Sequence, residues 1–435
     1  MCRCLSPYGT CTRRDVVRIE AGSRASCLIC GSRACFEIAR VCSLRGYLTW
    51  TSKSRKCSIA VGSSSGHARM ASSVPMVGQI GQSTSQGSPD VESTILPSRR
   101  TRVKGQRARK TGRPKFQSGP RPSKTDALPP SRTEDPALWR VRDELLRLDP
   151  TGARTAVAIR EAFDQAYDGQ RTGRWDYSQL HKTEKTHLGT LVEIWLQREF
   201  KFADGEDLDY RISGQDVDAK WSRDLYAWEI PPEMYSRGDQ IAMVLWANEY
   251  SIRWSMGLIR ISERVLLPEG KQRDRKRRLN DAGGDSILWI HRSRPMIENT
   301  LIHLPDGLMN EISDASSGQK AVNLLFSRVQ GHLINRSAIL TAAQQVDSAK
   351  RVRDARKALA RDGVVIFGHY DPHPKMARDL GLPAPTLGRF ISARLAEYEV
   401  GDSEPFTVIA NRRWRLARPD EEVGEAPPLP TQGNE

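Results

Sequence analysis

Cysteine is missing from most of this chain of 435 residues, since all eight cysteines lie within residues 2–57. The long remainder therefore cannot be held by disulfide bonds, and nothing in it excludes a reducing compartment. The pair Cys27 and Cys30, followed by Cys35 and Cys42, leaves a zinc knuckle open as an alternative. Because the spacings are irregular and no histidine lies nearby, we instead expect a poorly structured extension.

Long apolar runs are also absent. No segment approaches the roughly 20 apolar residues that a membrane span needs, and residues 1–25 lack the apolar block of a secretory signal. We therefore expect a cytoplasmic protein that makes no contact with a membrane. The length of the chain is sufficient for two or three folded domains.

Acidic residues are scarce in the first third of the chain, so the net charge of +15 is unevenly distributed. Residues 1–134 carry 24 Lys or Arg and 7 Asp or Glu, a net of +17, whereas the remaining 301 residues carry 43 and 45, a net of −2. Between Arg99 and Lys124 there are eleven basic residues and no acid. We expect a basic, disordered extension that either binds DNA by counterion release or is merely soluble. Translation could also begin later, at Met70 or Met76.

Regular structure is predicted from Asp135 onward, where an Asp-Pro pair precedes apolar residues at helical spacing. Three helices are expected, at Pro136–Leu148, Thr151–Ala166 and Tyr177–Phe200. Four short strands should follow, at Leu208–Ile212, Val217–Trp221, Ile241–Trp246 and Trp254–Ile261, with Ser213-Gly214 as a hairpin turn. Helices that precede and flank a mixed sheet indicate an α/β fold, which we assign to residues 135–290.

A second domain is expected over residues 296–425, followed by a short tail at 426–435. Its helices are predicted at Ala321–Leu333, Ser337–Val346 and Ser348–Arg361. Its strands are predicted at Val364–His369, 390–398 and 406–415. Three helices followed by strands is the order found in a winged helix-turn-helix.

Four residues between positions 193 and 220 are typical of metal-dependent phosphodiester hydrolysis. Asp218 and Lys220 are two apart on a predicted strand, so both side chains point to the same face. Asp209, on the neighbouring strand, could reach the same metal ion, and Glu193 on the preceding helix could complete the oxygen ligands. Mg²⁺ favours a few carboxylates together with water and substrate oxygens. The spacing alone leaves open that these residues form ordinary solvated salt bridges.

The segments around these residues resemble a known family. They are DGQRTGRW (168–175), QLHKTEKTHLGTLVEI (179–194), DYRISGQDVDAK (209–220), KRRL (276–279), AQQVDSAKRVR (343–353) and DLGLPAP (379–385). Over roughly residues 135–425 the chain resembles the restriction endonuclease NaeI family. The resemblance does not extend to the first 130 residues.

The resemblance implies a type IIE enzyme with two domains: a PD-(D/E)xK nuclease domain that uses Mg²⁺, and a winged helix-turn-helix DNA-binding domain. It further implies a homodimer that cuts double-stranded DNA at a short GC-rich palindrome and leaves 5′-phosphates. A second DNA site would activate cleavage, and a cognate DNA methyltransferase would belong to the same system.

The family's catalytic residues fall on Glu193, Asp209, Asp218 and Lys220, and its metal ligands on the three acids among them. All four positions match in residue type, so the resemblance implies an intact active site. The alternative is a non-catalytic, sequence-specific DNA-binding regulator with a degenerate nuclease half. The intact set of four argues against that alternative.

The predicted helix at Ser348–Arg361 carries a basic face. Lys350, Arg353 and Lys357 lie at i, i+3 and i+7 with Arg351 beside them, and apolar residues occupy the opposite side. A basic face on the third helix of such a unit commonly enters the major groove of DNA. An ordinary solvated helix face is the competing interpretation.

Residues 166–171 are similar to the DNA-ligase motif K-x-D-G-x-R. Ala166 occupies the place of the lysine that forms the covalent intermediate, so ligase chemistry is excluded. The segment is better explained as a polar turn at Asp168-Gly169 that follows a helix.

Two histidines and four tryptophans are expected to stabilise the fold rather than to bind metal or DNA. No cysteine or third histidine completes a zinc site with His181 and His187, so both are expected to pack or to form hydrogen bonds. Four tryptophans are expected in the sheet core rather than stacked on bases, namely Trp221, Trp228, Trp246 and Trp254.

Overall fold

The computed structural model describes residues 47–49, 58–60 and 121–430, except 238, 271, 272 and 346. The chain divides into two compact units, Met1–Pro97 and Ser98–Glu435. In the first unit, β1 (Tyr47–Thr49) pairs antiparallel with β2 (Ser58–Ala60). The cysteines of the possible zinc knuckle and the basic run before residue 121 lie outside the described residues. Among the residues that are described, no helix has the length and apolar character of a membrane span.

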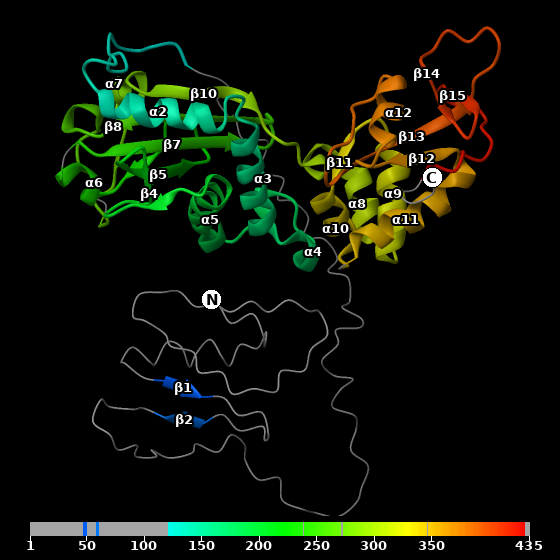
Figure 1. Cartoon of the computed structure of the whole chain (residues 1–435), viewed down its shortest axis with the longest axis horizontal. Helices are drawn as coiled ribbons and strands as arrows, with labels where there is room; N and C mark the ends of the chain where they lie inside the picture. Colours follow the sequence, from blue (N-terminus) through cyan, green and yellow to red (C-terminus); the bar gives the residue numbers. More distant parts are fainter. Residues whose placement is uncertain are drawn as a thin grey trace, which may run out of the picture. The chain divides into compact units, whose positions relative to one another are not determined.

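A mixed sheet of six strands forms the centre of the N-terminal half of the second unit (Figure 1), in the order β10-β8-β7-β5-β4-β3. The strands are β3 (Ala203–Asp204), β4 (Tyr210–Ile212), β5 (Gln215–Ser222), β7 (Ile241–Asn248), β8 (Arg253–Arg260) and β10 (Leu288–Pro295). Strands β5 and β7 are parallel, and the other neighbouring pairs are antiparallel. This arrangement confirms the predicted α/β class for this half and adds two unpredicted strands, β3 and β10.

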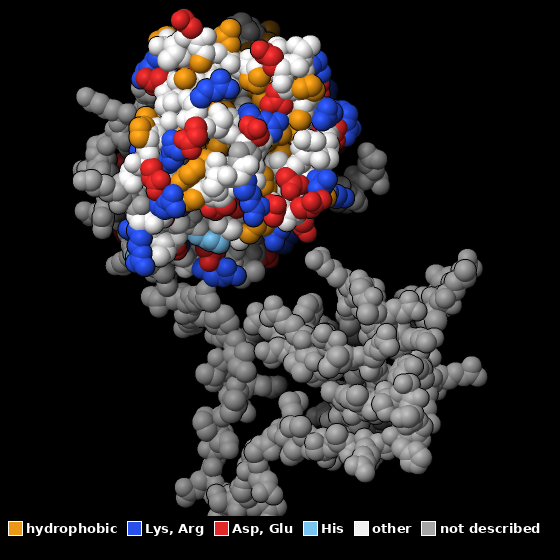
Figure 2. Space-filling view, turned by 90° about the vertical axis from the view of Figure 1, so that its left-hand side faces the viewer, with side chains coloured by type: hydrophobic (Ala, Val, Ile, Leu, Met, Phe, Trp, Pro, Cys, Tyr) orange, Lys and Arg blue, Asp and Glu red, His pale blue; other side chains and the backbone are white. Residues whose placement is uncertain are grey.

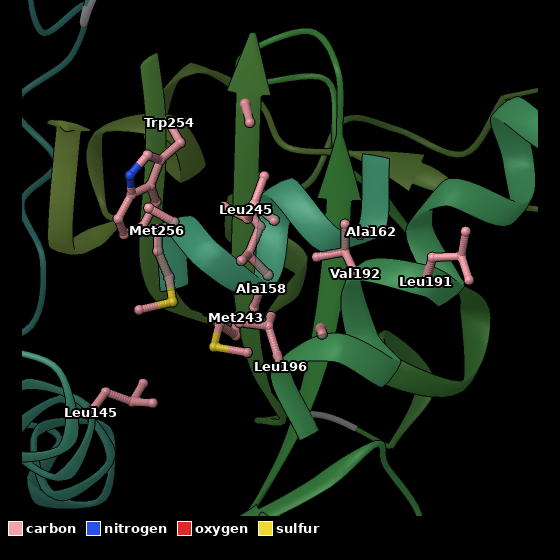
Figure 3. Close-up of a cluster of buried hydrophobic side chains, with 14 of the residues drawn as sticks. Leu145, Ala158, Ala162, Leu191, Val192, Leu196, Met243, Leu245, Trp254 and Met256 are labelled. Carbon is pink, nitrogen blue, oxygen red and sulfur yellow. The ribbon is translucent and has the colours of Figure 1, made fainter. Parts of the chain in front are cut away.

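Helices α2 (Pro136–Leu148), α3 (Ala153–Tyr167) and α5 (Lys182–Phe200) share a hydrophobic core with this sheet. Figure 3 shows Ala158 of α3 and Leu196 of α5 near Met243 of β7. Helix α2 has the predicted bounds because Asp135 accepts a hydrogen bond from the backbone N–H of Leu138 at 2.8 Å. The core therefore fixes α5, which carries Glu193, relative to the sheet.

A second cluster lies on the opposite face of the sheet, since alternate residues of β7 such as Val244 and Trp246 belong to it. Smaller elements lie around this face, namely β6 (Glu229–Ile230), α6 (Pro232–Ser236), β9 (Arg277–Arg278) and α7 (Asp281–Asp285). Trp228, Trp246 and Trp254 are at most 1% exposed, which confirms their predicted core role. Trp221 is only partly buried, against the first cluster.

The single helix predicted over residues 177–200 is wrong. The 3-10 helix η2 (Tyr177–Gln179) is followed by Leu180 and His181, whose backbone is extended. The Glu184 carboxylate then accepts a hydrogen bond from the backbone N–H of His181 at 2.9 Å, which starts α5 as a separate helix.

The turn predicted at Ser213-Gly214 is confirmed. Both residues are left-handed, with φ of 48° and 75°, as a two-residue hairpin between β4 and β5 requires. Tyr210 pairs with Val217, so β4 begins two residues later than predicted. The residue before β4 is Asp209, which the same register brings opposite Asp218.

The C-terminal half contains helices and a five-stranded sheet. Its elements are α8 (Asp306–Asp314), α9 (Gly318–Arg328), β11 (Leu333–Asn335), α10 (Arg336–Ala343), α11 (Ser348–Leu359), β12 (Val364–Phe367), α12 (His373–Asp379), β13 (Arg389–Glu397), β14 (Phe406–Ile409) and β15 (Arg412–Leu416). Helices α8 and α12 were not predicted. The single strand predicted over 406–415 is a hairpin, because Ala410 and Asn411 have left-handed φ of 49° and 61°.

Residues near both predicted domain limits are folded. The backbone N–H of Thr125 donates to the Asp285 carboxylate at 2.9 Å, so residues 121–134 belong to the folded unit rather than to a disordered extension. At the other end, the backbone N–H of Ala426 donates to Ala360 O at 2.7 Å. The first residues of the predicted tail therefore pack on the C-terminal half.

A short segment of the N-terminal half, residues 168–175, packs against the C-terminal half. Asp168, with φ of 43°, ends α3 as the predicted turn, and α4 (Gly169–Thr172) packs against α10. A Cβ on Gly169 would lie 2.0 Å from Thr341 Oγ1. Trp175 is buried in the core of the C-terminal half, and its carbonyl accepts a hydrogen bond from Asn299 Nδ2 at 2.9 Å. This connection was not predicted.

Candidate active site

Asp218 and Lys220 lie on β5, where alternation separates them from the core residues Val217 and Ala219. Asp218 is 6% exposed, and its Oδ2 lies 2.5 Å from Lys220 Nζ. The spacing of two residues therefore brings the carboxylate and the ammonium together on one side of the strand, as the sequence predicted.

Asp209 meets this pair across the β4–β5 hairpin. Its Oδ2 accepts a hydrogen bond from the backbone N–H of Ala219 at 2.8 Å. Since Ala219 lies between Asp218 and Lys220, that bond holds the Asp209 carboxylate beside both of them.

Glu193 comes from α5, whose position over the hairpin is fixed by two contacts. The Tyr210 hydroxyl donates a hydrogen bond to the backbone oxygen of Glu193 at 2.8 Å. One turn earlier, the Cβ position of Gly189 lies 3.7 Å from Trp221 Cβ. The helix therefore approaches β5 closely. The Glu193 carboxyl lies near enough to Asp209, Asp218 and Lys220 to interact with their charges.

The carboxyls of this cluster disfavour one another's charge. Burial, with the nearby Asp209 carboxylate, raises the pKa of Glu193 to about 7, although Lys220 opposes the shift. Burial also raises the pKa of Asp218; the ion pair with Lys220 counteracts this rise and the Asp209 carboxyl adds to it. Burial and the three surrounding carboxylates raise the pKa of Tyr210 as well. Three acids that repel one another in a partly dry site would be relieved by a cation.

The residues present fit a divalent metal ion. Asp218 Oδ2 is buried and has no hydrogen-bond partner, despite its proximity to the Lys220 ammonium. Across the described ranges, no three His, Cys, Asp or Glu side chains are arranged to hold a metal ion by themselves. Mg²⁺ commonly takes one or two carboxylates and completes its shell with water and substrate phosphate. The cluster therefore suits an ion that is bound together with a nucleic acid.

The predicted basic face lies on α11, in the other half of the unit from the acidic cluster. Lys350, Arg353 and Lys357 are exposed, and Arg351 is partly buried. Lys350 Nζ lies 2.8 Å from the Asp354 carboxylate, so part of the positive charge on this helix is compensated. The charge available to a ligand is smaller than the sequence pattern suggests.

Two histidines and the ligase-like segment have no place in the site. His181 precedes α5 and His187 lies in its second turn, and both are exposed, so of the two predicted roles packing is wrong. The hydrogen-bonding alternative holds for His181, whose backbone N–H donates to Glu184 at 2.9 Å. Ala166 is buried near the end of α3, where it contributes to the core.

Sequence reasoning missed an aromatic side chain near the N-terminus of α5. The Tyr177 ring lies 4.3 Å from Arg223 Cζ and 5.2 Å from Lys185 Nζ. An Arg–aromatic–Lys contact between residues 38 apart needs the fold to reveal it. The only sequence signal was the pair of lysines in KTEK, at 182–185.

A mixed α/β domain with three acids and a lysine gathered at a hairpin is typical of a metal-dependent nuclease. A family model described as restriction endonuclease NaeI matches residues 139–425. A relative, the type II restriction enzyme NaeI of Lentzea aerocolonigenes, is 45% identical over 312 residues, which cover 69% of this chain and 96% of the relative. The chain therefore belongs to the restriction endonuclease NaeI family, which confirms the resemblance and makes it a nuclease.

Proposed function

We propose that this chain is a type II, site-specific endonuclease that hydrolyses double-stranded DNA with Mg²⁺ and leaves 5′-phosphates. The observation that carries the proposal is the convergence of Glu193, Asp209, Asp218 and Lys220, together with the family membership. A degenerate nuclease half would have lost at least one of these side chains. A non-catalytic regulator therefore has no observation in its favour.

Each residue has a definite role in this proposal. Asp218 and Asp209 would hold Mg²⁺ at the phosphate and Glu193 would complete the acidic set. When bound, Mg²⁺ neutralises phosphate charge and makes water more acidic. Lys220 Nζ, 2.5 Å from the Asp218 carboxylate, can donate a hydrogen bond to the attacking water and orient it. Water attacks the phosphorus, the 3′ oxygen leaves and takes up a proton, and the phosphate stays on the 5′ oxygen.

The proposed architecture is a PD-(D/E)xK nuclease domain at 135–290 and a winged helix-turn-helix at 296–425. Helices α9, α10 and α11 followed by the β14–β15 hairpin support this order. Lys350, Arg351, Arg353 and Lys357 of α11 are the proposed DNA contacts of that domain. In Figure 2, side chains of both signs are interspersed on the nuclease side of the unit, so a strongly basic DNA surface is not found on that face.

The remaining features follow from the family. We propose a homodimer, since a palindrome needs one active site for each strand, and a GC-rich target. A second DNA site bound by the C-terminal domain would activate cleavage, and a cognate methyltransferase would protect the host DNA in the cytoplasm.

A continuous set of packed helices supports the idea of activation by a second site. Helix α11 packs on α10, α10 on α4, α4 on α3, and α3 on α5, which carries Glu193. The Trp195 indole of α5 also donates a hydrogen bond to Gln165 of α3 at 2.8 Å. DNA bound to α11 could therefore alter the position of Glu193 through these contacts, provided the set has two arrangements.

The direct test is to incubate the purified protein with plasmid DNA and Mg²⁺, and to sequence the ends of the products. We expect cuts at one short sequence, 5′-phosphates on every end and no cleavage in EDTA. Specific DNA binding without any cleavage, at any Mg²⁺ concentration, would favour the regulator.

A further inference from the structure

Two cations lie over the Tyr177 ring, and one of them, Arg223, directly follows the strand that carries Asp218 and Lys220. Arg223 Cζ is 4.3 Å and Lys185 Nζ is 5.2 Å from the ring centroid. Arg223 follows β5, and Lys185 belongs to the first turns of α5. The two elements that supply the catalytic residues therefore also bring these cations together.

One of the cations, Lys185, and one acid of the cluster, Glu193, lie along one stripe of α5. Lys185, Gly189 and Glu193 are spaced at i, i+4 and i+8, so they share a helix face. At Gly189 α5 lies close to β5, since a Cβ built there would be 3.7 Å from Trp221 Cβ. At 1.5 Å rise per residue, Lys185 lies about 12 Å along the helix from Glu193. This offset exceeds the rise of about 3.4 Å per nucleotide of a duplex, so a phosphate at Lys185 would be a different one from the phosphate at the acidic cluster.

Lys185 is available to an anion, although Asp224 also lies near the Tyr177 ring. In the part of the chain that the structure describes, Lys185 makes no salt bridge. It lies near the N-terminus of α5, where the helix dipole favours anions and disfavours a lysine. The nearby Asp176 carboxylate is engaged by the Ser178 N–H at 2.7 Å and by the Tyr250 hydroxyl at 2.5 Å. Arg223 has further partners, so Lys185 is the more decisive of the two cations.

We propose that Lys185 and Arg223, which both lie over Tyr177, bind a phosphodiester of the DNA strand a few nucleotides from the phosphate that is cut. This inference rests on the proposed nuclease function and adds a site that positions the substrate. The bound phosphate would fix the register of the strand over Asp218, and the Tyr177 ring would hold both cations in place. The alternative is that the two cations only pack on the ring and stabilise the start of α5.

The test uses Lys185→Gln and Arg223→Gln in the full chain, with Arg198→Gln as the matched control. Arg198 also lies over an aromatic ring of α5, with its Cζ 5.3 Å from the Trp195 centroid, but on another side of the helix. DNA binding without Mg²⁺ is measured from low to high salt, on a duplex that contains the site cut by the wild type. Cleavage by each variant is measured as kcat and KM, and folding as Tm.

Each substitution in the pair should reduce the slope of log Kd against log salt, and the two together should reduce it by about 0.9, the value for one phosphate that is no longer neutralised. KM should rise several-fold while kcat at saturating DNA stays near that of the wild type. Arg198→Gln should leave the slope unchanged. An unchanged slope in Lys185→Gln would overturn the inference, and that variant decides the question if Arg223→Gln does not fold. A wild type that cuts no DNA would instead refute the proposed function.

Discussion

Glu193 is a proposed active-site residue whose buried carboxylate should destabilise the fold when it ionises. Burial and the carboxylate of Asp209 raise its pKa from the usual 4.5 to about 7. The folded, metal-free protein therefore holds the Glu193 proton more tightly than the unfolded chain does. The free energy of unfolding should then decrease as pH rises from about 4.5 to about 7, because the buried carboxylate must ionise.

Glu193→Gln should remove this loss of stability. In EDTA at pH 8, we expect the Tm of the variant to exceed that of the wild type by about 2–8 °C, with little difference near pH 5. Cleavage with Mg²⁺ should be lost, because the amide carries no charge. Thermal unfolding at the two pH values checks the first part. A variant less stable than the wild type at pH 8 would show that Glu193 is not strained by its neighbours.

Cleavage should depend on the shape as well as the charge of the group at position 220. Lys220→Ala removes the ammonium next to Asp218 and should decrease kcat by about 10²-fold or more. Lys220→Arg should restore little activity, because the guanidinium is larger, planar and always protonated. Single-turnover cleavage at saturating DNA separates these effects from weaker binding. Full activity of the Arg variant would exclude a close role for the amine.

At the scale of the elements, α11 is the proposed DNA-reading helix. Replacing Lys350, Arg353 and Lys357 with Ala should leave cleavage in the absence of added DNA nearly unchanged, since these residues are in the other half of the unit. Binding of a second duplex should weaken, and its salt slope should decrease by about one for each phosphate that the variant no longer binds. Because Lys350 already pairs with Asp354 at 2.8 Å, Lys350 should contribute least of the three to this change in the salt slope.

A double variant of α12 provides the control for this helix. Lys375→Ala with Arg378→Ala removes two exposed cations from the same half without touching α11. Activation by an added cognate oligonucleotide should fade in the α11 variant and persist in the α12 variant. Equal activation of both would show that α11 does not contact the second DNA.

Several elements could be predicted because their signals are local. Asp135, Pro136 and the apolar stripe define α2, and Ser213-Gly214 defines the β4–β5 hairpin. The site followed from the period of two that joins Asp218 to Lys220. The β14–β15 hairpin was missed because its turn uses Ala410 and Asn411, without glycine.

Other features were missed, and apart from the local cap at the start of α5 they depend on contacts between distant residues. The break at Leu180 and His181 follows from a new cap at Glu184 within an otherwise helical pattern. The contact of Tyr177 with Arg223 and the burial of Trp175 in the C-terminal half both require the tertiary fold. The same is true of the packing of residues 121–125 on α7.

At the scale of the molecule, α4 is one of the contacts between the two halves. Gly169→Ala would bring a Cβ within 2.0 Å of Thr341 Oγ1 and 2.7 Å of the Arg174 carbonyl, so α4 must move away from α10. We expect activation by a second DNA to decrease several-fold more than unactivated cleavage does. Gly307→Ala, whose Cβ would meet nothing within 4 Å, is the matched control and should behave as the wild type. Undiminished activation in Gly169→Ala would exclude coupling of the two halves through the contact between α4 and α10.

The central claim is that the acidic cluster hydrolyses DNA, and Asp218 tests it most directly. Cleavage with Mg²⁺ and specific DNA binding in EDTA should be measured in parallel for the wild type, Asp218→Ala and the isosteric Asp218→Asn. We predict that both variants keep their affinity for the cognate duplex and lose cleavage by roughly 10²–10³-fold, since each lacks the carboxylate charge at the phosphate. Cleavage within a few-fold of the wild type in either variant would contradict the account.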